Sequence, residues 1–461
     1  GGCRRFSALA AAVILSSSGS ILLMMSQLDK SFPDLDVDQQ PPPVDFKRPD
    51  KKQEYPPANP KSKHPIYELL ADNLRTNISN WSPLVYSTCD ASWMPELFAP
   101  CLDIPGENIV KQELVYPDFR IRIPHFVNNQ DGQYWLKEAA IRPQFEDNWG
   151  MYKGQYGQNI VYPGGTYTGM PTSGWHESSC MNSKVSHQLK RENADGGGGA
   201  ETVVIASAPD VHSFQHFLDR GTHIILQSEP HFTNDTRVWF SSRLPQSTVK
   251  QILEGLSTQL YPHAGGSISA SKQVIFSCRA PLIHPYLSLR LLERLHVRPL
   301  PIGERKIVLY VGRKNSRNKG RNVRNEDLLF ERIRHLLATR MKNETLVYFD
   351  HTEWPTLQDM IPYFSNVAAV IGPHGGSFFN HRWAGRDTLV MEFVPKSRFS
   401  MMFWEEASIL NQNYWAILLD TTGNHDMIAP VNEVVNVLDK HLGEPLDHPS
   451  LEHYYPWKIG K

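Results

Sequence analysis

The stretch Val370–Pro395, VIGPHGGSFFNHRWAGRDTLVMEFVP, decides the fold class of this chain. Its start overlaps a short apolar run, Ala368–Ile371, and it ends in a second one, Thr388–Phe393; both are typical of buried strands. Between them, two glycines precede the segment Ser377–Ala384, which we expect to be helical. Strand, helix and strand of these lengths are typical of one unit of a parallel α/β sheet.

The same alternation continues on both sides of this stretch. Asn325 is of a type that caps helices, and the two acidic residues after it suit the positive end of a helix. In chain order we expect a strand at Ile307–Val311, a helix from Asn325 to about Met341, a strand at Thr345–Phe349, helices at Leu357–Phe364 and Ser400–Leu410, a strand at Tyr414–Leu419 and a helix at Val431–His441. This pattern predicts a Rossmann-like domain over residues 301–461, with helices on both faces of a parallel sheet.

The chain before residue 301 gives a weaker pattern. Glu201–Ala206 and Gln273–Cys278 are typical of buried strands, and a helix-like stretch follows the first of them. Tyr286–Leu295 has apolar residues at helical spacing. Between His64 and Ala200 periodicity is weak, so we assign residues 64–300 to a first domain with insertions.

The first residues predict a membrane anchor. Two arginines precede the apolar stretch Phe6–Met25, which is about as long as a spanning helix requires. We interpret residues 1–30 as a cytosolic tip and signal anchor, with a cleaved signal peptide as the alternative. Residues 31–63, which include Pro41–Pro43, have the composition of an extended stem. Both interpretations place the remaining chain in the secretory lumen.

Two further features agree with a lumenal body. Cys3 would be cytosolic, which leaves four cysteines that allow three pairings in an oxidising compartment, Cys89, Cys101, Cys180 and Cys278. The Asn-x-Ser/Thr sequons that could accept glycans are Asn77, Asn80, Asn234 and Asn343.

The near balance of basic and acidic residues argues against a nucleic-acid-binding protein. The 461 residues carry 47 Lys and Arg against 48 Asp and Glu, a formal net charge of −1. With no global positive field, any anion site must be local.

Local anion sites are expected at the carboxyl ends of the parallel strands. Arg313 directly follows a predicted strand, where its guanidinium can fork onto a diphosphate. The basic run continues through Arg317, Arg321 and Asn325, and a solvated loop is the alternative interpretation of this run. Further along, Gly375 allows close approach of a phosphate.

The second cluster is Gly372–Ser377, GPHGGS, between a strand and a helix. Gly375 and Gly376 let the backbone approach a phosphate, the helix N-terminus favours an anion, and His374 could bond a diphosphate or sugar. Glycines at such turns are also commonly structural. The end of the cluster is Ser377, and one turn later comes Asn380, which we expect either at the same rim or simply at the surface.

The third signal is Glu392, a carboxylate near the end of an apolar strand. A buried carboxylate needs a partner, which a ribose diol or a structural arginine could supply.

Taken in order, Arg313, Arg321, Asn325 and the run Val370–Pro395 resemble the family 61 glycosyltransferases, which include plant N-glycan core β-1,2-xylosyltransferases, xylan-modifying transferases and O-linked N-acetylglucosaminyltransferases. The resemblance spans about Val203 to Pro395, and Gly376 stands where the family often has alanine. It implies a GT-B-type fold, two Rossmann-like domains facing a cleft, and inverting transfer from a UDP-sugar. Donor binding would then fall to Arg313, His374, Gly375, Gly376 and Glu392.

The same resemblance extends to the family's upstream His and Asp motif, matched here by Ser213–Asp219, SFQHFLD. Inversion needs one group that takes the proton of the acceptor hydroxyl. His216 and Asp219 would lie on one side of a helix, at i and i+3, and we expect one of them to be this base. Asp219 could equally be a surface residue or orient His216.

A metal is not expected. His212 and His216 have the spacing of a zinc hydrolase helix, but a serine stands where that motif has its catalytic Glu. The one Asp-x-Asp run, Asp34–Asp38, falls in the predicted stem. We therefore expect transfer without a metal or other cofactor, with Arg side chains and a helix dipole neutralising UDP.

The sequence thus predicts a single-pass Golgi membrane glycosyltransferase with a lumenal body, with the endoplasmic reticulum as the alternative location. The preferred reaction moves xylose from UDP-xylose to the core mannose of N-glycans, because the stretch Ser213–Phe217 looks nearest to that branch of the family. Transfer of N-acetylglucosamine or a pentose to another glycan is the second candidate. A lectin-like protein without turnover and a zinc hydrolase are the candidates from other classes.

Overall fold

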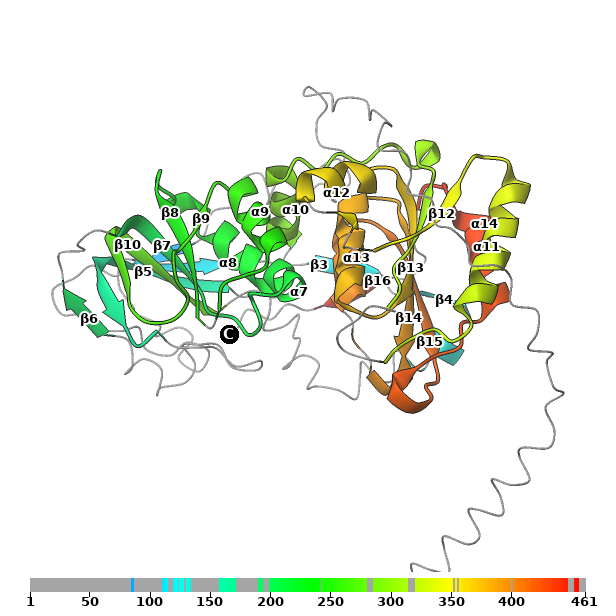
Figure 1. The fold of residues 1–461 in the computed structure, drawn as a ribbon, viewed down its shortest axis with the longest axis horizontal. Helices are drawn as coiled ribbons and strands as arrows, with labels where there is room; N and C mark the ends of the chain where they lie inside the picture. Colours follow the sequence, from blue (N-terminus) through cyan, green and yellow to red (C-terminus); the bar gives the residue numbers. More distant parts are fainter. Residues whose placement is uncertain are drawn as a thin grey trace, which may run out of the picture. The chain divides into compact units, whose positions relative to one another are not determined.

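The computed structural model describes residues 84–86, 110–114, 119–122, 124–127, 130–132, 134, 157–170, 190–193, 199–241, 243–279, 285–313, 320–350, 353–354, 356–398, 400, 402–446 and 452–455. All of them belong to one compact unit, Pro57–Lys461. Two large sheets organise this unit, each with its own helices (Figure 1).

The C-terminal sheet is parallel throughout its described pairs, with the strand order β12-β11-β13-β14-β15-β4. Its strands are β11 (Ile307–Tyr310), β12 (Thr345–Tyr348), β13 (Val367–Pro373), β14 (Leu389–Pro395), β15 (Asn413–Leu419) and β4 (His125–Phe126). The parallel sheet predicted from the alternating pattern is therefore confirmed. Strand β4 is an addition from residues that we expected to serve only the first domain.

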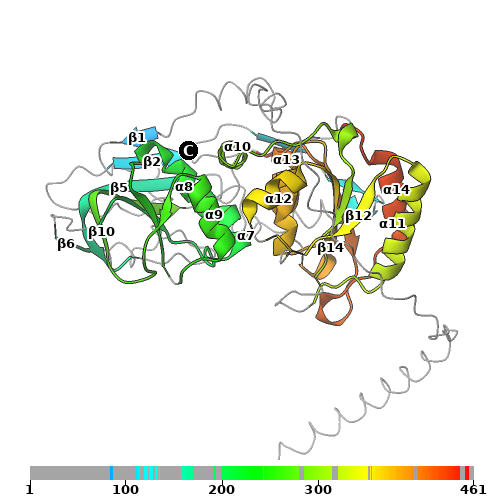
Figure 2. The same ribbon diagram turned by 45° about the horizontal axis from the view of Figure 1, so that its top comes forward.

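Helices cover both faces of this sheet, as Figure 2 shows from a second side. The helices are α11 (Glu326–Arg340), α12 (Leu357–Phe364), a 3-10 helix (Gly376–Ala384), α13 (Met402–Ile409) and α14 (Val431–His441). Helices α11 and α14 share one apolar cluster with Val308 and Tyr310 of β11. The alternate residues Ile307 and Leu309 face the other cluster, which includes α12, α13 and the 3-10 helix. Alternation of side chains along a strand explains this division.

The N-terminal sheet is mixed. Its order is β1-β2-β5-β10-β7-β8-β9, with β6 paired to β5. Strands β10, β7, β8 and β9 are parallel, whereas β1, β2, β5 and β6 join by antiparallel pairing. The bounds are β1 (Leu84–Tyr86), β2 (Val110–Leu114), β5 (Gly157–Thr168), β6 (Lys190–Asn193), β7 (Ala200–Ala206), β8 (Thr236–Phe240), β9 (Gln259–Leu260) and β10 (Ile268–Arg279). The parallel pairing that a Rossmann-like domain requires is thus limited to β10, β7, β8 and β9.

The helices associated with this sheet begin with one irregular segment. Helix α7 (Phe214–His216) continues into a π-helix (Phe217–Gly221) and then into α8 (Thr222–Gln227). Helices α9 (Ser247–Gly255) and α10 (Pro285–Arg294) follow. A small separate sheet pairs β3 (Phe119–Arg122) with β16 (Glu452–Tyr455).

Two local expectations need correction. The segment after Gly375 is a 3-10 helix rather than an α-helix. Asn325 occupies the N-cap position of α11, but its side chain makes no capping bond. Its amide instead donates to Ala429 O at 2.9 Å and accepts from Ala429 N at 2.8 Å, because this loop packs beside the helix start.

Several expectations fall outside the described residues. These are the anchor and stem (residues 1–63), the sequons Asn77 and Asn80, and the cysteines Cys3, Cys89, Cys101 and Cys180. Cys278 lies in β10. Asn234 and Asn343 are exposed, as glycan acceptors must be. Within the described segments, no helix has the length and apolar character needed to cross a membrane.

His381 is a buried histidine on the 3-10 helix. Gln412 uses its Nε2 to donate to the backbone of His381 and Gly385, so its Oε1 accepts from His381 Nδ1 at 2.7 Å. Burial, more than the nearby Arg382 charge, lowers the pKa of His381 to about 3, while the Gln412 bond opposes this. The folded imidazole therefore stays neutral at the pH at which an unfolded histidine takes up a proton.

This difference predicts acid sensitivity. The contribution of His381 to the free energy of unfolding is complete above pH 6.5 and is lost as the pH falls from 6.5 towards 3. The free energy of unfolding should fall with a slope of up to about 1.4 kcal/mol per pH unit in this range. Urea denaturation of the wild type and His381→Gln across this range measures it, and the variant should show the shallower loss. Equal slopes for the two proteins would contradict the assignment.

Candidate active site

The loop Pro373–Ser377, which we call the donor loop because the sequence predicts donor binding there, begins at the last residue of β13. Gly372 before it has φ of +158°, and a Cβ there would meet the backbone oxygen of Val311. The backbone N–H of His374 donates to Phe393 O at 3.1 Å. Glycine at position 372 therefore allows β11 and β13 to approach closely where the loop begins.

His374 is held in place by Glu392 of β14. Its Nδ1 lies 2.5 Å from Glu392 Oε1, and its ring packs on Phe403 with centroids 4.9 Å apart. The hydroxyl of Tyr414 donates to Glu392 Oε2. Burial above all, and then the Glu392 charge, raises the pKa of Tyr414 well above its usual value, so the hydroxyl keeps its proton.

These bonds define the role of Glu392. The residue is 0% exposed, and both oxygens are used by His374 and Tyr414. The protein partners of Glu392 are therefore His374 and Tyr414 rather than a structural arginine. Glu392 lies behind His374 and orients its ring, which leaves His374 Nε2 as the nitrogen that can meet a ligand.

Arg313 lies across the donor loop. Its Nε donates to Gly320 O at 2.9 Å and its Nη1 to His374 O at 3.4 Å. A Cβ on Gly375 would collide with Nη1, so glycine is needed there for close approach. The fold therefore brings Arg313, His374 and Gly375 together from two strands, as the sequence predicted.

The other basic-run residues are placed differently. Arg317 lies outside the described residues. Arg321 is buried, with φ of +61°, and its backbone N–H donates to Asn424 O at 3.1 Å. The contacts of Arg321 and Asn325 run to the loop between β15 and α14.

Asn380 has a structural setting. It is buried, its Nδ2 donates to Ser377 O at 2.9 Å, and its Oδ1 accepts from Trp383 Nε1 at 2.9 Å. Both ends of the amide thus form hydrogen bonds within the 3-10 helix. These bonds connect Asn380 to Ser377 at the end of the donor loop.

His216 and Asp219 form a pair on the helical segment of the first sheet. His216 Nδ1 lies 3.2 Å from Asp219 Oδ2, which confirms the predicted juxtaposition at i and i+3. The Asp219 side chain is 0% exposed and that of His216 is 19% exposed. Asp219 Oδ1 lies 3.8 Å from Arg220 Nε. Of these two side chains, only that of His216 is accessible from the surface.

The segment that carries this pair packs against the end of the donor loop and the 3-10 helix that follows it. A Cβ on Gly376 would lie 2.7 Å from Oε1 of Gln215, the residue before His216. Arg382, on the 3-10 helix that begins at Gly376, donates to Leu218 O at 3.3 Å. Two motifs separated by more than 150 residues are therefore adjacent in space.

A family model, Glycosyltransferase 61, matches residues 93–391, which is well over half of the chain. The chain belongs to the family 61 glycosyltransferases. A comparison with curated proteins found no match. Membership means transfer of a sugar from a donor to a glycan acceptor. The matched residues include the His216–Asp219 pair, Arg313 and the donor loop.

The zinc-hydrolase motif is not formed in this glycosyltransferase. His212 lies in the turn before α7, so it does not share a helix with His216. Among the residues that the structure describes, no group of three or more His, Cys, Asp or Glu could hold a metal ion.

Three site residues of this family 61 member were missed by sequence reasoning. Tyr414 comes from the neighbouring strand, and only the strand register brings it to Glu392. Gln215 is part of a motif whose function was sought in His216 and Asp219. Arg382 could have been found from the sequence, because it is a charged residue within the aromatic run Phe378–Trp383. A charged side chain in such a buried run needs a partner.

The two loop glycines should respond differently to alanine. Gly375→Ala must displace Arg313 and break its bonds to Gly320 and His374, at a cost of about 1–3 kcal/mol. Gly376→Ala meets mainly the movable end of Gln215 and should cost less. Thermal denaturation of both variants tests this. A Gly376→Ala protein less stable than Gly375→Ala would contradict the proposed packing.

Proposed function

We propose that this glycosyltransferase inverts the anomeric centre of a UDP-sugar as it transfers the sugar to a glycan in the Golgi lumen. The single observation that supports this most strongly is the adjacency of the His216–Asp219 pair and the donor loop. Direct displacement of UDP by an acceptor hydroxyl needs a group that takes the proton of the hydroxyl and a loop that binds the diphosphate.

On the donor side, Arg313 and the donor loop would receive the diphosphate. The first N–H groups of the helix at Gly376 lack partners within the helix, and its dipole favours an anion. Arg313 lies beside them and can fork onto phosphate oxygens. His374, with Nδ1 fixed by Glu392, would present Nε2 to the donor.

On the acceptor side, His216 is the proposed catalytic base. Its ring takes the proton of the acceptor hydroxyl while the acceptor oxygen bonds to the anomeric carbon and the bond from that carbon to UDP breaks. UDP leaves with the electron pair of this bond, and its charge is balanced by Arg313. Asp219 stabilises the imidazolium that forms on His216.

The donor and acceptor are proposed by resemblance. UDP-xylose transfer to the N-glycan core mannose is preferred because of the stretch Ser213–Phe217. UDP-N-acetylglucosamine or another pentose donor is the alternative, and release of UDP from a panel of UDP-sugars distinguishes them. Transfer without a metal is proposed because a nearby arginine and a helix N-terminus can carry the leaving-group charge.

The remaining organisation is also proposed. Residues 64–300 and 301–461 would be the acceptor-side and donor-side domains of a GT-B-type fold. A signal anchor and stem would hold this body on the lumenal side of the Golgi membrane, with Asn234 and Asn343 glycosylated.

Substitutions of the His216–Asp219 pair test the assignment of the base. His216→Gln should lower kcat by about 10²–10⁴-fold, because the proton of the acceptor then has no base to receive it. Asp219→Asn should lower kcat less, since the imidazole remains. UDP affinity, measured by calorimetry, should stay near the wild-type value in both.

The matched control is His212→Gln, a nearby histidine outside the proposed chemistry. Near-normal turnover by His216→Gln, or a larger loss in the control, would contradict the role of His216. A wild-type chain that neither binds UDP nor consumes any UDP-sugar would contradict the proposed function itself.

A further inference from the structure

A buried ion pair lies beneath the candidate site. Arg382 Nη2 is 2.8 Å from Glu406 Oε1, and the two side chains are 0% and 1% exposed. Arg382 also stacks on Phe379, with its guanidinium carbon 4.2 Å from the ring centroid. A buried ion pair is often no more stabilising than apolar residues of the same size, because both charges lose their hydration. Its presence in an apolar cluster therefore needs another explanation.

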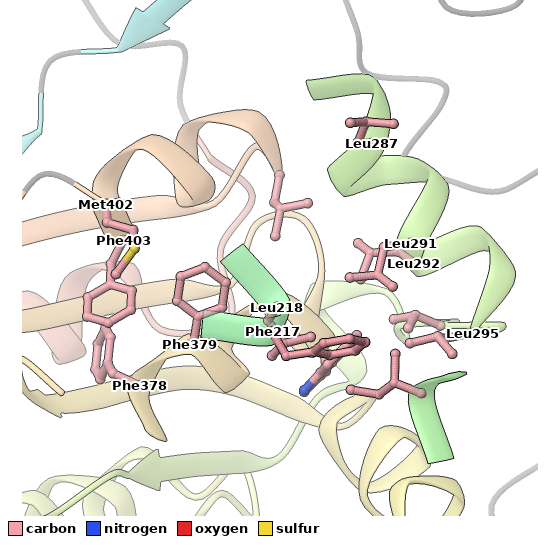
Figure 3. Close-up of a cluster of buried hydrophobic side chains, with 14 of the residues drawn as sticks. Phe217, Leu218, Leu287, Leu291, Leu292, Leu295, Phe378, Phe379, Met402 and Phe403 are labelled. Carbon is pink, nitrogen blue, oxygen red and sulfur yellow. The ribbon is translucent and has the colours of Figure 1, made fainter. Parts of the chain in front are cut away.

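The surroundings of the pair are strongly apolar. Figure 3 shows Phe217, Leu218, Phe379 and Phe403 gathered with leucines of α10 in this region. Burial lowers the pKa of Arg382, and attraction to Glu406 and then Asp219 opposes that effect. Burial raises the pKa of Glu406, and the Arg382 charge opposes it. The charge of each residue thus opposes the effect of burial on the pKa of the other.

Arg382 holds the backbone of the segment that carries Asp219. Its Nη1 donates to Leu218 O at 3.3 Å, one residue before Asp219. Thr222 Oγ1 donates to the same carbonyl at 2.9 Å. Leu218 lies in the π-helix, where the usual i+4 bonds are replaced by wider ones. Two side chains therefore fix the irregular turn that aims the His216–Asp219 pair.

Glu406 extends the connection on its other side. Its Oε2 accepts from Ser288 Oγ of α10 at 3.2 Å, and Ser288 lies 3.3 Å from His223 Nε2 of α8. Glu406 shares α13 with Phe403, which packs on His374. Both partners of the ion pair thus belong to elements that also contact the donor loop.

We propose that Arg382, held by Glu406, is a positioning residue for transfer. Arg382 fixes the Leu218 carbonyl and places a cation near Asp219. Because Arg382 lies on the 3-10 helix that begins in the donor loop, these contacts set the position of the His216–Asp219 pair relative to that loop. This inference rests on the proposed function, because it concerns the geometry of the same reaction. It assigns Arg382 no contact with substrate.

Replacing both Arg382 and Glu406 distinguishes an effect on the position of the reacting groups from an effect on the stability of the fold. In Arg382→Met/Glu406→Met, neither ion of the pair is left without the other, and Asp219 keeps His216 and Arg220 beside it, so the melting temperature should remain near that of the wild type. The Leu218 carbonyl then loses Arg382, and small displacements of reacting groups cost about 10²-fold in rate. We expect that fall in kcat with the full chain, while the Kd for UDP changes by less than about twofold.

The chain offers a matched control. Arg340 and Glu344 form another poorly exposed pair, with Nε 2.8 Å from Oε2 and side chains 9% and 3% exposed. Arg340 likewise donates to backbone carbonyls, those of Asp439 and Leu442. Arg340→Met/Glu344→Met should leave kcat unchanged, because its contacts are to α14 and not to the site.

The outcomes are distinct. A folded Arg382→Met/Glu406→Met protein with kcat within about twofold of the wild type overturns the proposal. If this variant fails to fold, Arg382→Lys decides: it keeps the charge but cannot span Glu406 and Leu218 together. Arg382→Lys with reduced kcat and unchanged UDP affinity supports positioning, and normal kcat overturns it. A wild-type chain without transferase activity would instead refute the proposed function.

Discussion

The packing of the segment Phe214–Gln227 against the 3-10 helix Gly376–Ala384 is the constraint on which the site depends. Glycine at position 376 allows Gln215 to lie against the start of that helix, and Arg382 reaches the Leu218 carbonyl further along it. Because the first segment carries His216 and the second begins at the donor loop, one contact brings together the two halves of the reaction. Family 61 membership assigns glycosyl transfer to the chain, and the proposed mechanism locates that reaction at this contact.

Three buried carboxylates around this contact have different partners and therefore different roles. Glu392 is shared by His374 and Tyr414 and fixes one imidazole. Asp219 lies against His216 and fixes the other. Glu406 is neutralised by Arg382 and lies between helices. None of the three is exposed, since each is at most 1% accessible at its side chain or as a residue. In the proposed mechanism, the side chains that meet substrates are therefore His216, His374 and Arg313.

The C-terminal sheet could be predicted from sequence because its strands are short apolar runs separated by helices with clear periodicity. Helices α12 and α14 begin and end at the predicted residues. The antiparallel strands of the first sheet could not be predicted in this way. Strand β5 contains Pro163, Gly164 and Gly165, which are typical of turns. Its pairing depends on β2 and β10, which are far away in sequence.

In the candidate site, too, contacts between residues close in sequence could be predicted, and contacts between distant elements could not. Local patterns predicted His216 with Asp219 and the glycines with His374, because each set is fixed by one turn or one helix. The role of Glu392 could not be predicted, because register alone brings Tyr414 of β15 to its carboxylate. The sequence left Asp219 open as base, surface residue or orienting residue, and its burial is what favours the orienting role in the proposed mechanism. Arg382 is recognised only once the two helical segments are in contact.

A structure of the full chain crystallised with UDP tests the central claim most directly. The account predicts the diphosphate within hydrogen-bonding distance of the Arg313 guanidinium and the backbone N–H groups at Gly375 and Gly376. UDP bound at a different edge of the sheet, with the donor loop still filled by the protein's own side chains, would contradict it.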